Sequence, residues 1–455
     1  MRGIVYHSMS IRSKLRRHGL FDARVPRFTS YPPATRFTAA VGPADYAAWL
    51  GQVPSKQAIS LYVHVPFCRR LCWFCACRTQ GTKTGTALGG YVASLLAEAA
   101  LIRRQLPNEI RITRLHLGGG TPTILPPELM DRLLGGLDRV FGLGALDEFS
   151  VEIDPTECDR ERLAMLAQYG LNRASIGIQD FEPRVQVAIG RAQSLMVTTE
   201  AIDTLRDLGI HAINLDLLYG LPYQRRDTLS RTLDHVQTLD PSRLALYGYA
   251  HVPWVSKRQV MIPTDALPSP EERLDLTELA QHWLLGAGFR QVGIDHFARP
   301  DDSLAIAFNE RRLARNFQGY TDDRAPMLIG LGASSISRHP AGYAQNEPST
   351  GRYQARVARG ELPIARGTAL TETDLLVGHM VESLMCYHDL RIDEFGAAAG
   401  EAAMRAAQLV REFGDCVEFD GRLLRVKHWA WPLTRIMAAS LGSTTEPGQR
   451  FSAAV

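Results

Sequence analysis

Three cysteines lie within eight residues of the chain and could carry redox chemistry. They are Cys68, Cys72 and Cys75, in the segment VPFCRRLCWFCAC. Cysteine thiolates are the usual ligands of [4Fe-4S] clusters, which normally take four of them. The C-x3-C-x2-C spacing supplies three, so we expect a cluster with one iron left open to a ligand that is not protein.

Other uses of these cysteines fit the sequence less well. A structural zinc site usually takes two separated pairs of ligands, and no second C-x2-C or Cys/His pair follows downstream. Cys77 could supply a fourth thiolate, but four ligands from ten residues would strain the backbone around one tetrahedron. A disulfide framework does not suit a chain with seven cysteines in 455 residues. The iron-sulfur cluster is therefore the favoured interpretation.

Further motifs surround and follow the cysteines. In chain order, the segments are YVHVPFCRRLCWFCAC, LGGGTPT, EIDP, IGIQDF, NLDLLYGLP, GYAHVP, DHFARPDD and NFQGY. On these motifs the sequence resembles the radical S-adenosylmethionine superfamily and, within it, the family of oxygen-independent coproporphyrinogen III oxidases. The resemblance runs from about Arg24 to the far C-terminus and is weakest after Tyr387.

This resemblance implies a fold and a set of cofactors. The implied fold is α/β: a partial (β/α)6 radical SAM barrel with an N-terminal extension and a small, mainly helical C-terminal domain. The implied cofactors are a [4Fe-4S] cluster on the three cysteines and S-adenosylmethionine on the open iron, with a second S-adenosylmethionine beside the first. The residues that match the family's cofactor contacts are Tyr62, Phe74, Gly119, Gly120, Thr121, Glu152, Gln179, Arg191, Asp216, Ala250 and Ile336.

The resemblance also implies an activity. One electron from the cluster cleaves S-adenosylmethionine to methionine and a 5′-deoxyadenosyl radical, which takes hydrogen from the β-carbon of a substrate propionate. Loss of carbon dioxide and one electron then leaves a vinyl group, and two such reactions convert coproporphyrinogen III to protoporphyrinogen IX. An electron donor such as a flavodoxin or ferredoxin is implied as a partner. Cys77 matches a family cysteine that is needed for activity without ligating the cluster.

A second hypothesis is a heme-binding or heme-delivering relative that keeps the cluster and lacks oxidase activity. A radical methyltransferase or a heme-degrading relative is a third, lesser hypothesis. Cys77, the NFQGY segment at 316–320 and the RVPRFTSYP segment at 24–32 favour the oxidase, because the heme chaperones typically carry an apolar residue at the Cys77 position and lack NFQGY.

We expect arginine side chains to bind a substrate with four carboxylates, because a planar guanidinium can bind a carboxylate through two hydrogen bonds. Arg24 and Arg27 are the predicted substrate contacts, because the family's N-terminal segment takes part in substrate handling. Tyr31 would lie nearby.

The elements that must position these residues follow a strand and helix pattern. Helical segments are expected at Thr86 to Leu106 and Asp159 to Tyr169. Alternating strands and helices indicate parallel βα units, which close into a barrel or form a doubly wound sheet. In either case ligand groups gather at the carboxyl ends of the strands. Short apolar runs that we expect to be strands lie at 58–65, 111–117, 149–153, 174–178, 212–219, 243–249 and 289–294.

Three glycines follow the second expected strand, in LGGGTPT. Gly118, Gly119 and Gly120 carry no side chains, so the backbone there can approach a ligand closely. A tight turn alone would need about one glycine.

We expect three parts in the chain: an N-terminal arm and substrate-handling segment at 1–50, the catalytic barrel with its extension at 51–370, and a helical, winged-helix-like domain at 371–455. The last begins with an amphipathic helix after a Thr-x-x-Asp start signal at Thr371. It also contains CVEFDGRLLRVK, in which DG predicts a hairpin turn.

Composition is that of an ordinary enzyme. The net charge is +3, and no concentrated Lys/Arg stripe indicates nucleic-acid binding. No run of eighteen apolar residues predicts a membrane span, and residues 1–20 lack the apolar core of a secretory signal. Those residues are basic and are expected to form a solvated arm. Cytoplasmic location, with its reducing conditions, and a monomeric state are expected.

Several single residues are predicted to have minor roles. His64 is expected to form a hydrogen bond on the cofactor side, with a structural strand residue as the alternative. Asp295 and His296 are expected to be structural. Cys158, Cys386 and Cys416 are expected to pack as small apolar residues.

Overall fold

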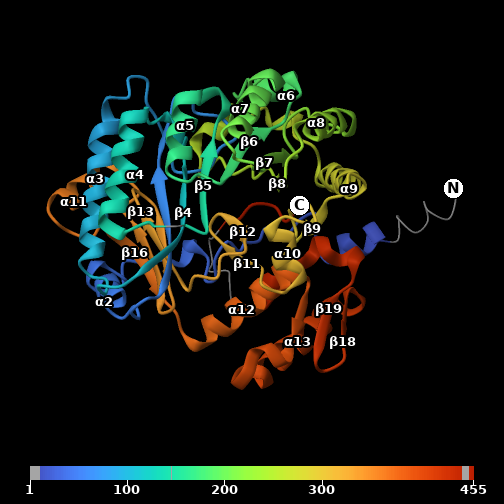
Figure 1. The fold of residues 1–455 in the computed structure, drawn as a ribbon. Helices are drawn as coiled ribbons and strands as arrows, with labels where there is room; N and C mark the ends of the chain where they lie inside the picture. The colour runs from blue at the N-terminus through green and yellow to red at the C-terminus, as the bar shows by residue number, and fades with distance from the viewer. Residues whose placement is uncertain (1–10, 145, 443–449) are drawn as a thin grey trace.

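A twelve-stranded mixed sheet forms the centre of the protein, in a computed structural model that describes residues 11–144, 146–442 and 450–455 (Figure 1). The strand order is β16-β15-β14-β13-β1-β4-β5-β6-β7-β8-β10-β9. The strands from β13 to β8 are parallel. Because β1 and β8 are not neighbours in this order, the sheet is open, as a partial barrel requires. The parallel strands are β13 (Met327–Leu331), β1 (Ala58–Val65), β4 (Arg111–Gly119), β5 (Glu148–Ile153), β6 (Arg173–Gln179), β7 (Ala212–Tyr219) and β8 (Arg243–Gly248).

Antiparallel strands extend both edges of this parallel set. They are β14 (Ile336–His339), β15 (Gly342–Asn346) and β16 (Ile364–Ala369) on one edge, with β10 (His296–Ala298) and β9 (Arg290–Val292) on the other. Short strands form three further small sheets, which pair β2 (Phe67–Cys68) with β3 (Gln80–Gly81), β11 (Ala314–Asn316) with β12 (Gly319–Thr321), and β19 (Leu423–Val426) with both β17 (Asp389–Arg391) and β18 (Val417–Phe419).

Helices cover the outer face of the parallel strands, as Figure 1 shows for α3 to α9. Local signals start several of them. The Ser269 side chain caps α9 in a capping box with Glu272, and Thr371 caps α12 with Asp374. The helices are α2 (Pro43–Gly51), α3 (Thr86–Arg103), α4 (Pro127–Phe141), α5 (Arg160–Gln168), α6 (Pro183–Ala188), α7 (Leu195–Asp207), α8 (Arg226–Leu239), α9 (Pro270–Gly286), α10 (Ser303–Asn309), α11 (Thr350–Ala358), α12 (Glu372–Tyr387), α13 (Ala399–Phe413) and α14 (Thr434–Ser440). Short 3-10 helices lie at Ala34–Arg36, Pro122–Ile124, Pro155–Glu157, Lys257–Met261, Thr264–Ala266, Ile392–Ala398, Gly414–Cys416 and His428–Leu433.

Burial alternates along the central strands. In β6 and β7 every second residue is fully buried, and the residues between them are half-buried. The buried set is apolar and packs under the helices, whereas the other set, which includes Ser175, Asn214 and Asp216, faces the opposite side of the sheet. The period of two therefore places polar side chains on the inner face of the barrel.

The N-terminal segment packs into a core, which corrects the expectation of a solvated arm for residues 11–20. Residues 11–17 are helical, and both Leu15 and Leu20 are only 1% exposed. They share an apolar cluster with α12, α13 and α14. Figure 1 shows this blue helix beside the red C-terminal elements. The apolar residues of this helix stand among basic residues, so the sequence did not indicate a buried helix.

Most expected elements are found. The expected strands correspond to β1, β4, β5, β6, β7, β8 and β9, and the expected helices to α3 and α5. The hairpin predicted from CVEFDGRLLRVK is β18 and β19. One difference concerns β9, which pairs antiparallel with β10 and does not continue the parallel set. Among the described residues, no helix is both long and apolar enough to cross a membrane.

Candidate active site

The clustered cysteines lie just after β1, where the carboxyl ends of the parallel strands meet. Cys68 belongs to β2, and Cys72 and Cys75 lie in the loop that leads to β3. All three are free thiols. Cys72 is buried, and the other two are half-buried. The loop therefore lies at the edge of the barrel predicted to hold the cofactors.

The thiols of the loop are not gathered around a single point. In the described part of the chain, the one group of three His, Cys or acidic ligand atoms within 4.8 Å of one another is His18, Asp415 and Cys416. Three thiolates on one zinc ion, each at about 2.3 Å, would meet that limit, and those of the cysteine loop do not. The loop fits a cluster in which each thiolate binds a separate iron.

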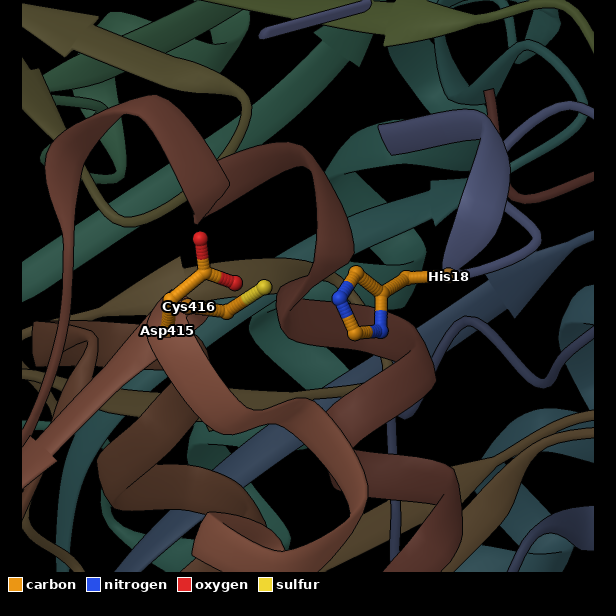
Figure 2. A group of neighbouring side chains, drawn as sticks. All are labelled: His18, Asp415 and Cys416. Carbon is orange, nitrogen blue, oxygen red and sulfur yellow. The ribbon is translucent and has the colours of Figure 1, made fainter. Parts of the chain in front are cut away.

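The His18 group is far from this loop in sequence and already has a cation. Figure 2 shows His18 beside the Asp415 carboxylate and the Cys416 sulfur. The Lys14 ammonium forms an ion pair with Asp415 and lies 5.0 Å from the centre of the Trp429 ring. The Lys14 ammonium neutralises the Asp415 carboxylate. These contacts also join the N-terminal helix to the C-terminal elements.

Two donors reach the sulfur atoms of the loop. Thr121 Oγ1 lies 3.7 Å from Cys68 Sγ, and Arg191 Nη1 lies 3.6 Å from Cys72 Sγ. Arg191 also pairs with Asp154 at 3.0 Å. Burial raises the pKa of Cys68 to about 11, so its thiolate needs a nearby positive charge such as iron. Both donors would stabilise negative charge on ligating sulfur.

Three side chains from the segment after β8 hold the backbone of the cysteine loop. They are Ser256, Arg258 and Gln259, whose side chains donate to main-chain carbonyl oxygens. The acceptors are, in the same order, the carbonyls of Cys75, Cys77 and Phe74, at 2.8, 3.1 and 2.7 Å. Sequence reasoning missed these residues, because about 180 positions separate each donor from its acceptor and no motif connects them.

The glycine run fits against the protein itself. A Cβ on Gly120 would lie 2.6 Å from the Phe67 carbonyl oxygen and 2.9 Å from that of Val65. Gly119 has φ +114°, and a Cβ there would lie 2.4 Å from His64 Nδ1. The Gly120 amide donates to Val65 O at 2.8 Å. The missing side chains thus let the end of β4 pack directly against the segment that leads into the cysteine loop.

Tyr62, His116 and Glu152 form a connected group on the inner face. The Tyr62 ring stacks on His116 with centroids 5.8 Å apart. The Gly119 amide donates to Glu152 Oε2 at 2.8 Å, and His116 Nε2 lies 3.5 Å from Glu152 Oε1. Burial alone would raise the pKa of Glu152, but His116 and the Gly119 amide lower it below its usual value. Glu152 is therefore a carboxylate suited to an ammonium group.

A second polar group lies on β6 and β7. Asp216 accepts from Ser175 Oγ at 3.0 Å and from Asn214 Nδ2 at 2.9 Å. Burial raises the pKa of Asp216. Gln179 ends β6 with φ +70°, at a shift of register against β7. This irregularity changes the direction of the Gln179 side chain relative to the regular alternation of the strand.

The remaining predicted cofactor contacts lie at the same edge. Phe74 and Ala250 line one cavity, and Gln259 Nε2 bonds the Ala250 carbonyl at 3.0 Å. Ile336 begins β14, and its carbonyl approaches Gly330, which pairs with Tyr62 in the sheet. The roles of these residues stay predictions.

A cavity of about 870 Å³ opens beside the loop. Phe74, Cys75, Ala76 and Cys77 form one side, which we call the cysteine wall. We call a second set of lining residues the arginine wall; it consists of Arg27, Arg273, Arg315 and Arg435. The exposed Arg450 also lines the cavity and is not counted in the wall. The volume suits a large organic ligand.

Cys77 belongs to the cavity surface. It is an exposed thiol within the cysteine wall. A hydrogen bond between the Cys75 and Cys77 side chains lowers the pKa of Cys75 and raises that of Cys77. Cys77 is therefore close to the predicted ligand triplet and also open to a molecule in the cavity.

The three predicted substrate residues are separated in the structure. Arg27 lines the cavity, and its guanidinium donates to the Gly248 carbonyl at 2.5 Å. Arg24 is exposed and lies 5.8 Å from the ring centre of Trp254. Tyr31 lines a second hollow of about 340 Å³. Of the three, Arg27 is the one that lines the larger cavity.

The minor predictions have mixed outcomes. Both ring nitrogens of His64 have protein partners, the Tyr62 hydroxyl at 2.9 Å and the Arg78 carbonyl at 3.1 Å, and its role on the cofactor side stays a prediction. Asp295 lines the cavity and bonds His296 at 2.7 Å. Cys386 and Cys416 are fully buried, as expected, and Cys158 is half-buried.

Known proteins resemble this chain along nearly its full length. A family model described as the radical SAM superfamily matches residues 62–236. A Paracoccus denitrificans protein named oxygen-independent coproporphyrinogen III oxidase is 50% identical over 98% of this chain and 100% of its own. A Cereibacter sphaeroides protein named coproporphyrinogen III oxidase, anaerobic 1, is 47% identical over 96% of this chain and 98% of its own.

A solved structure extends the match to three dimensions. It is coproporphyrinogen III oxidase from Escherichia coli, described as a radical SAM enzyme. It is 32% identical, covers 93% of this chain and 100% of its own, and superposes with a TM-score of 0.87. This match confirms the predicted fold class. The chain belongs to the family of oxygen-independent coproporphyrinogen III oxidases, within the radical SAM superfamily.

Proposed function

We propose that this protein oxidatively decarboxylates two propionates of coproporphyrinogen III, without oxygen, to give protoporphyrinogen IX in heme biosynthesis. The observation that carries the proposal is the cavity of about 870 Å³, which has the cysteine loop on one side and arginines on another. A porphyrinogen there would place its acidic side chains between a radical source and cationic groups.

Cys68, Cys72 and Cys75 would hold a [4Fe-4S] cluster, and family membership supports S-adenosylmethionine as its partner. When bound, the two together supply a 5′-deoxyadenosyl radical that removes hydrogen from a propionate β-carbon. Thr121 and Arg191 would stabilise the thiolate charge through their contacts with sulfur. Ser256 and Gln259 would keep the loop backbone in place.

The ionised Glu152 carboxylate would bind the ammonium of the methionine part, because its charge and hydrogen bonds suit a cation. Tyr62, Gly119, Gly120 and Thr121 would surround that part. We propose a second S-adenosylmethionine beside the first. The other residues for the two molecules would be Phe74, Gln179, Arg191, Asp216, Ala250 and Ile336.

Cys77 would face the substrate as an exposed thiol next to the cluster ligands. We propose that it is needed for turnover and does not ligate iron. The three-part organisation at 1–50, 51–370 and 371–455 remains a proposal. A flavodoxin or ferredoxin would deliver electrons, and the enzyme would work as a monomer in the reducing cytoplasm.

Anaerobic turnover tests the proposal. The reconstituted protein would receive a reductant, S-adenosylmethionine and coproporphyrinogen III, and the porphyrins would be separated by chromatography. We expect a three-carboxylate intermediate followed by protoporphyrinogen IX. If S-adenosylmethionine is cleaved while the porphyrinogen stays unchanged, the substrate assignment is wrong. Heme binding without oxidation would then support the heme-delivery alternative.

A further inference from the structure

The arginine wall is assembled from four distant parts of the chain. Arg27 comes from the N-terminal segment, Arg273 from α9, Arg315 from β11 and Arg435 from α14. The two buried arginines of the described residues, Arg191 and Arg243, each have a carboxylate partner. Within the described residues, no carboxylate oxygen lies within 4.0 Å of any guanidinium of the arginine wall.

Main-chain carbonyls and aromatic rings hold the arginine wall in place. Arg273 Nη2 donates to the Tyr249 carbonyl at 2.8 Å. Arg315 Nε donates to the Phe28 carbonyl at 3.0 Å, and its guanidinium lies 4.5 Å from the ring centre of Tyr320. These contacts fix the direction of the guanidinium groups, and the carboxylate that attracts Arg27 and Arg315, that of Asp295, forms an ion pair with neither of them.

Two donor atoms of the wall have no partner. Arg273 Nε and Arg315 Nη1 are buried and make no hydrogen bond. A buried donor without a partner costs free energy, roughly 1–3 kcal/mol and more for charged groups. The guanidinium groups of Arg273 and Arg315 are therefore incompletely hydrogen-bonded within the protein.

The charged groups of the cavity also indicate an anionic ligand. Two acidic side chains line it: Asp295 bonds His296 at 2.7 Å and is attracted by Arg315 and Arg27, and Glu278 lies 3.7 Å from Arg12. Burial, and repulsion from Arg27 and Arg315, lower the pKa of Arg435 to about 9. Arginine nevertheless stays protonated in proteins near neutral pH. The wall is therefore a concentration of positive charge that an anionic ligand would stabilise.

Arg435 has a different role from the others. Its guanidinium bonds the carbonyls of Val25 and Pro26 at 2.9 and 3.3 Å, and those of Ala453 and Ala454 at 3.3 and 3.1 Å. It joins the N-terminal segment to residues near the end of the chain, at the border of the cavity. Arg435 is a positioning residue that also contributes positive charge.

We propose that Arg27, Arg273 and Arg315 bind carboxylates of the substrate and make the cavity selective for a tetracarboxylate over a dicarboxylate porphyrin. The proposal rests on the proposed function and assigns two residues, Arg273 and Arg315, that no sequence motif identified. Carboxylates would form hydrogen bonds with the guanidinium groups and neutralise the wall. Three guanidinium groups would favour a substrate with four carboxylates over the final product, which retains two.

Binding to the full-length, cluster-loaded protein tests the proposal without turnover. The probes are coproporphyrin III, with four carboxylates, protoporphyrin IX, with two, and the tetramethyl ester of coproporphyrin III, with none. Fluorescence titration under anaerobic conditions gives each Kd. We expect Arg273→Gln and Arg315→Gln each to raise the Kd for coproporphyrin III by about 10- to 100-fold. Their effect on the ester should be within about twofold.

Arg311→Gln is the matched control. Arg311 also lies over a tyrosine, with 4.2 Å to the ring centre of Tyr387, but it pairs with Asp389 and lies outside the cavity lining. Its variant should bind all three probes as the unaltered protein does. Equal affinity of the Arg273 and Arg315 variants for coproporphyrin III, or an equal loss for the ester, would overturn the proposal.

Two further measurements keep the test decisive if a Gln variant folds poorly. Arg273→Lys and Arg315→Lys retain charge without the planar guanidinium, so they should bind with intermediate affinity. In the unaltered protein, raising salt from about 0.05 to 0.5 M should weaken binding of the tetracarboxylate and not of the ester. A salt-independent Kd would contradict the proposal. If the unaltered protein neither binds nor converts the tetracarboxylate, the proposed function itself fails.

Discussion

The cysteine wall and the arginine wall border one cavity but differ in their sequence origin and in their charge balance. The cysteine wall comes from four consecutive residues, and the groups around it are already paired, as in Arg191 with Asp154. The arginine wall combines residues from positions 27 to 435 and lacks carboxylate partners among the described residues. Contacts within the protein hold the cysteine wall in place before any ligand binds, whereas an anionic ligand would stabilise the positive charge of the arginine wall.

This difference suits the two kinds of ligand. A cluster and its cofactor need fixed geometry, which paired charges and main-chain anchors provide. A substrate must enter and its product must leave, so its site gains from groups that are satisfied only when the correct ligand is bound.

Removal of a predicted cluster ligand should have the largest effect. Cys72→Ser should lose the cluster and all turnover, because an alcohol is a poor substitute for a thiolate on iron. Iron content, the visible absorbance of the cluster and S-adenosylmethionine cleavage would measure the loss. Cys158→Ser is the control, since Cys158 lies outside the loop and its Sγ donates to the Pro155 carbonyl, at 3.6 Å. A Cys72 variant with normal iron content would contradict the ligand assignment.

Loss of the cation beside the sulfur should have the next largest effect. Arg191→Gln removes the contact with Cys72 Sγ and leaves Asp154 buried without its ion pair. We expect the affinity for the cluster to fall about 10- to 100-fold, measured by iron release to a chelator. Asp154→Asn in the same chain should restore part of the affinity. Arg191→Gln should leave binding of coproporphyrin III to the arginine wall within about twofold.

A side chain on Gly120 should displace the cysteine wall and leave the arginine wall in place. Gly120→Ala would push a Cβ against the main chain of Pro66 and Phe67, which cannot move aside as a flexible side chain can. We expect a loss of about 3 kcal/mol in the free energy of unfolding, with slower cluster loading. Gly89→Ala is the control, because a Cβ on Gly89 in α3 meets no atom within 4 Å; it should stabilise by about 0.5–1 kcal/mol. Equal stability of the two variants would contradict close packing at Gly120.

The stability of the protein should depend on pH because of one buried carboxyl, that of Glu98. Glu98 is fully buried and accepts from the Gly332 amide at 2.7 Å and from Tyr353 at 2.6 Å. Burial raises the pKa of Glu98 from 4.5 to about 7. Between these values the folded protein holds a proton that the unfolded chain releases, so stability falls as pH rises from about 4.5 to 7.

Denaturant unfolding at pH 5 and pH 7 would measure this effect. We expect the unaltered protein to lose about 2 kcal/mol of unfolding free energy between the two values relative to Glu98→Gln, which cannot ionise. The two proteins would show the same pH dependence if Glu98 stayed ionised throughout. That outcome would place a charge, in place of a neutral acid, beneath the strands that carry Tyr62.

The cysteine loop and the strands and helices around it were predicted from the sequence. The strands from 58–65 to 243–249 were predictable because their apolar alternation is local, and the helix after Thr371 was predictable from its start signal. The N-terminal helix was missed, since Leu15 and Leu20 stand among basic residues. Arg258 and Gln259 were missed as supports of the loop, because their partners lie about 180 positions earlier.

The sequence by itself determined the family and the positions of the central strands, and it predicted the cluster ligands. These follow from residues that are neighbours in the chain, since ligand spacing and strand alternation are set over a few positions. Only the tertiary structure decided which of the 51 basic residues face the cavity. Arg27, Arg273, Arg315 and Arg435 meet because distant elements pack together, and a set of contacts made across hundreds of residues leaves no local pattern to read.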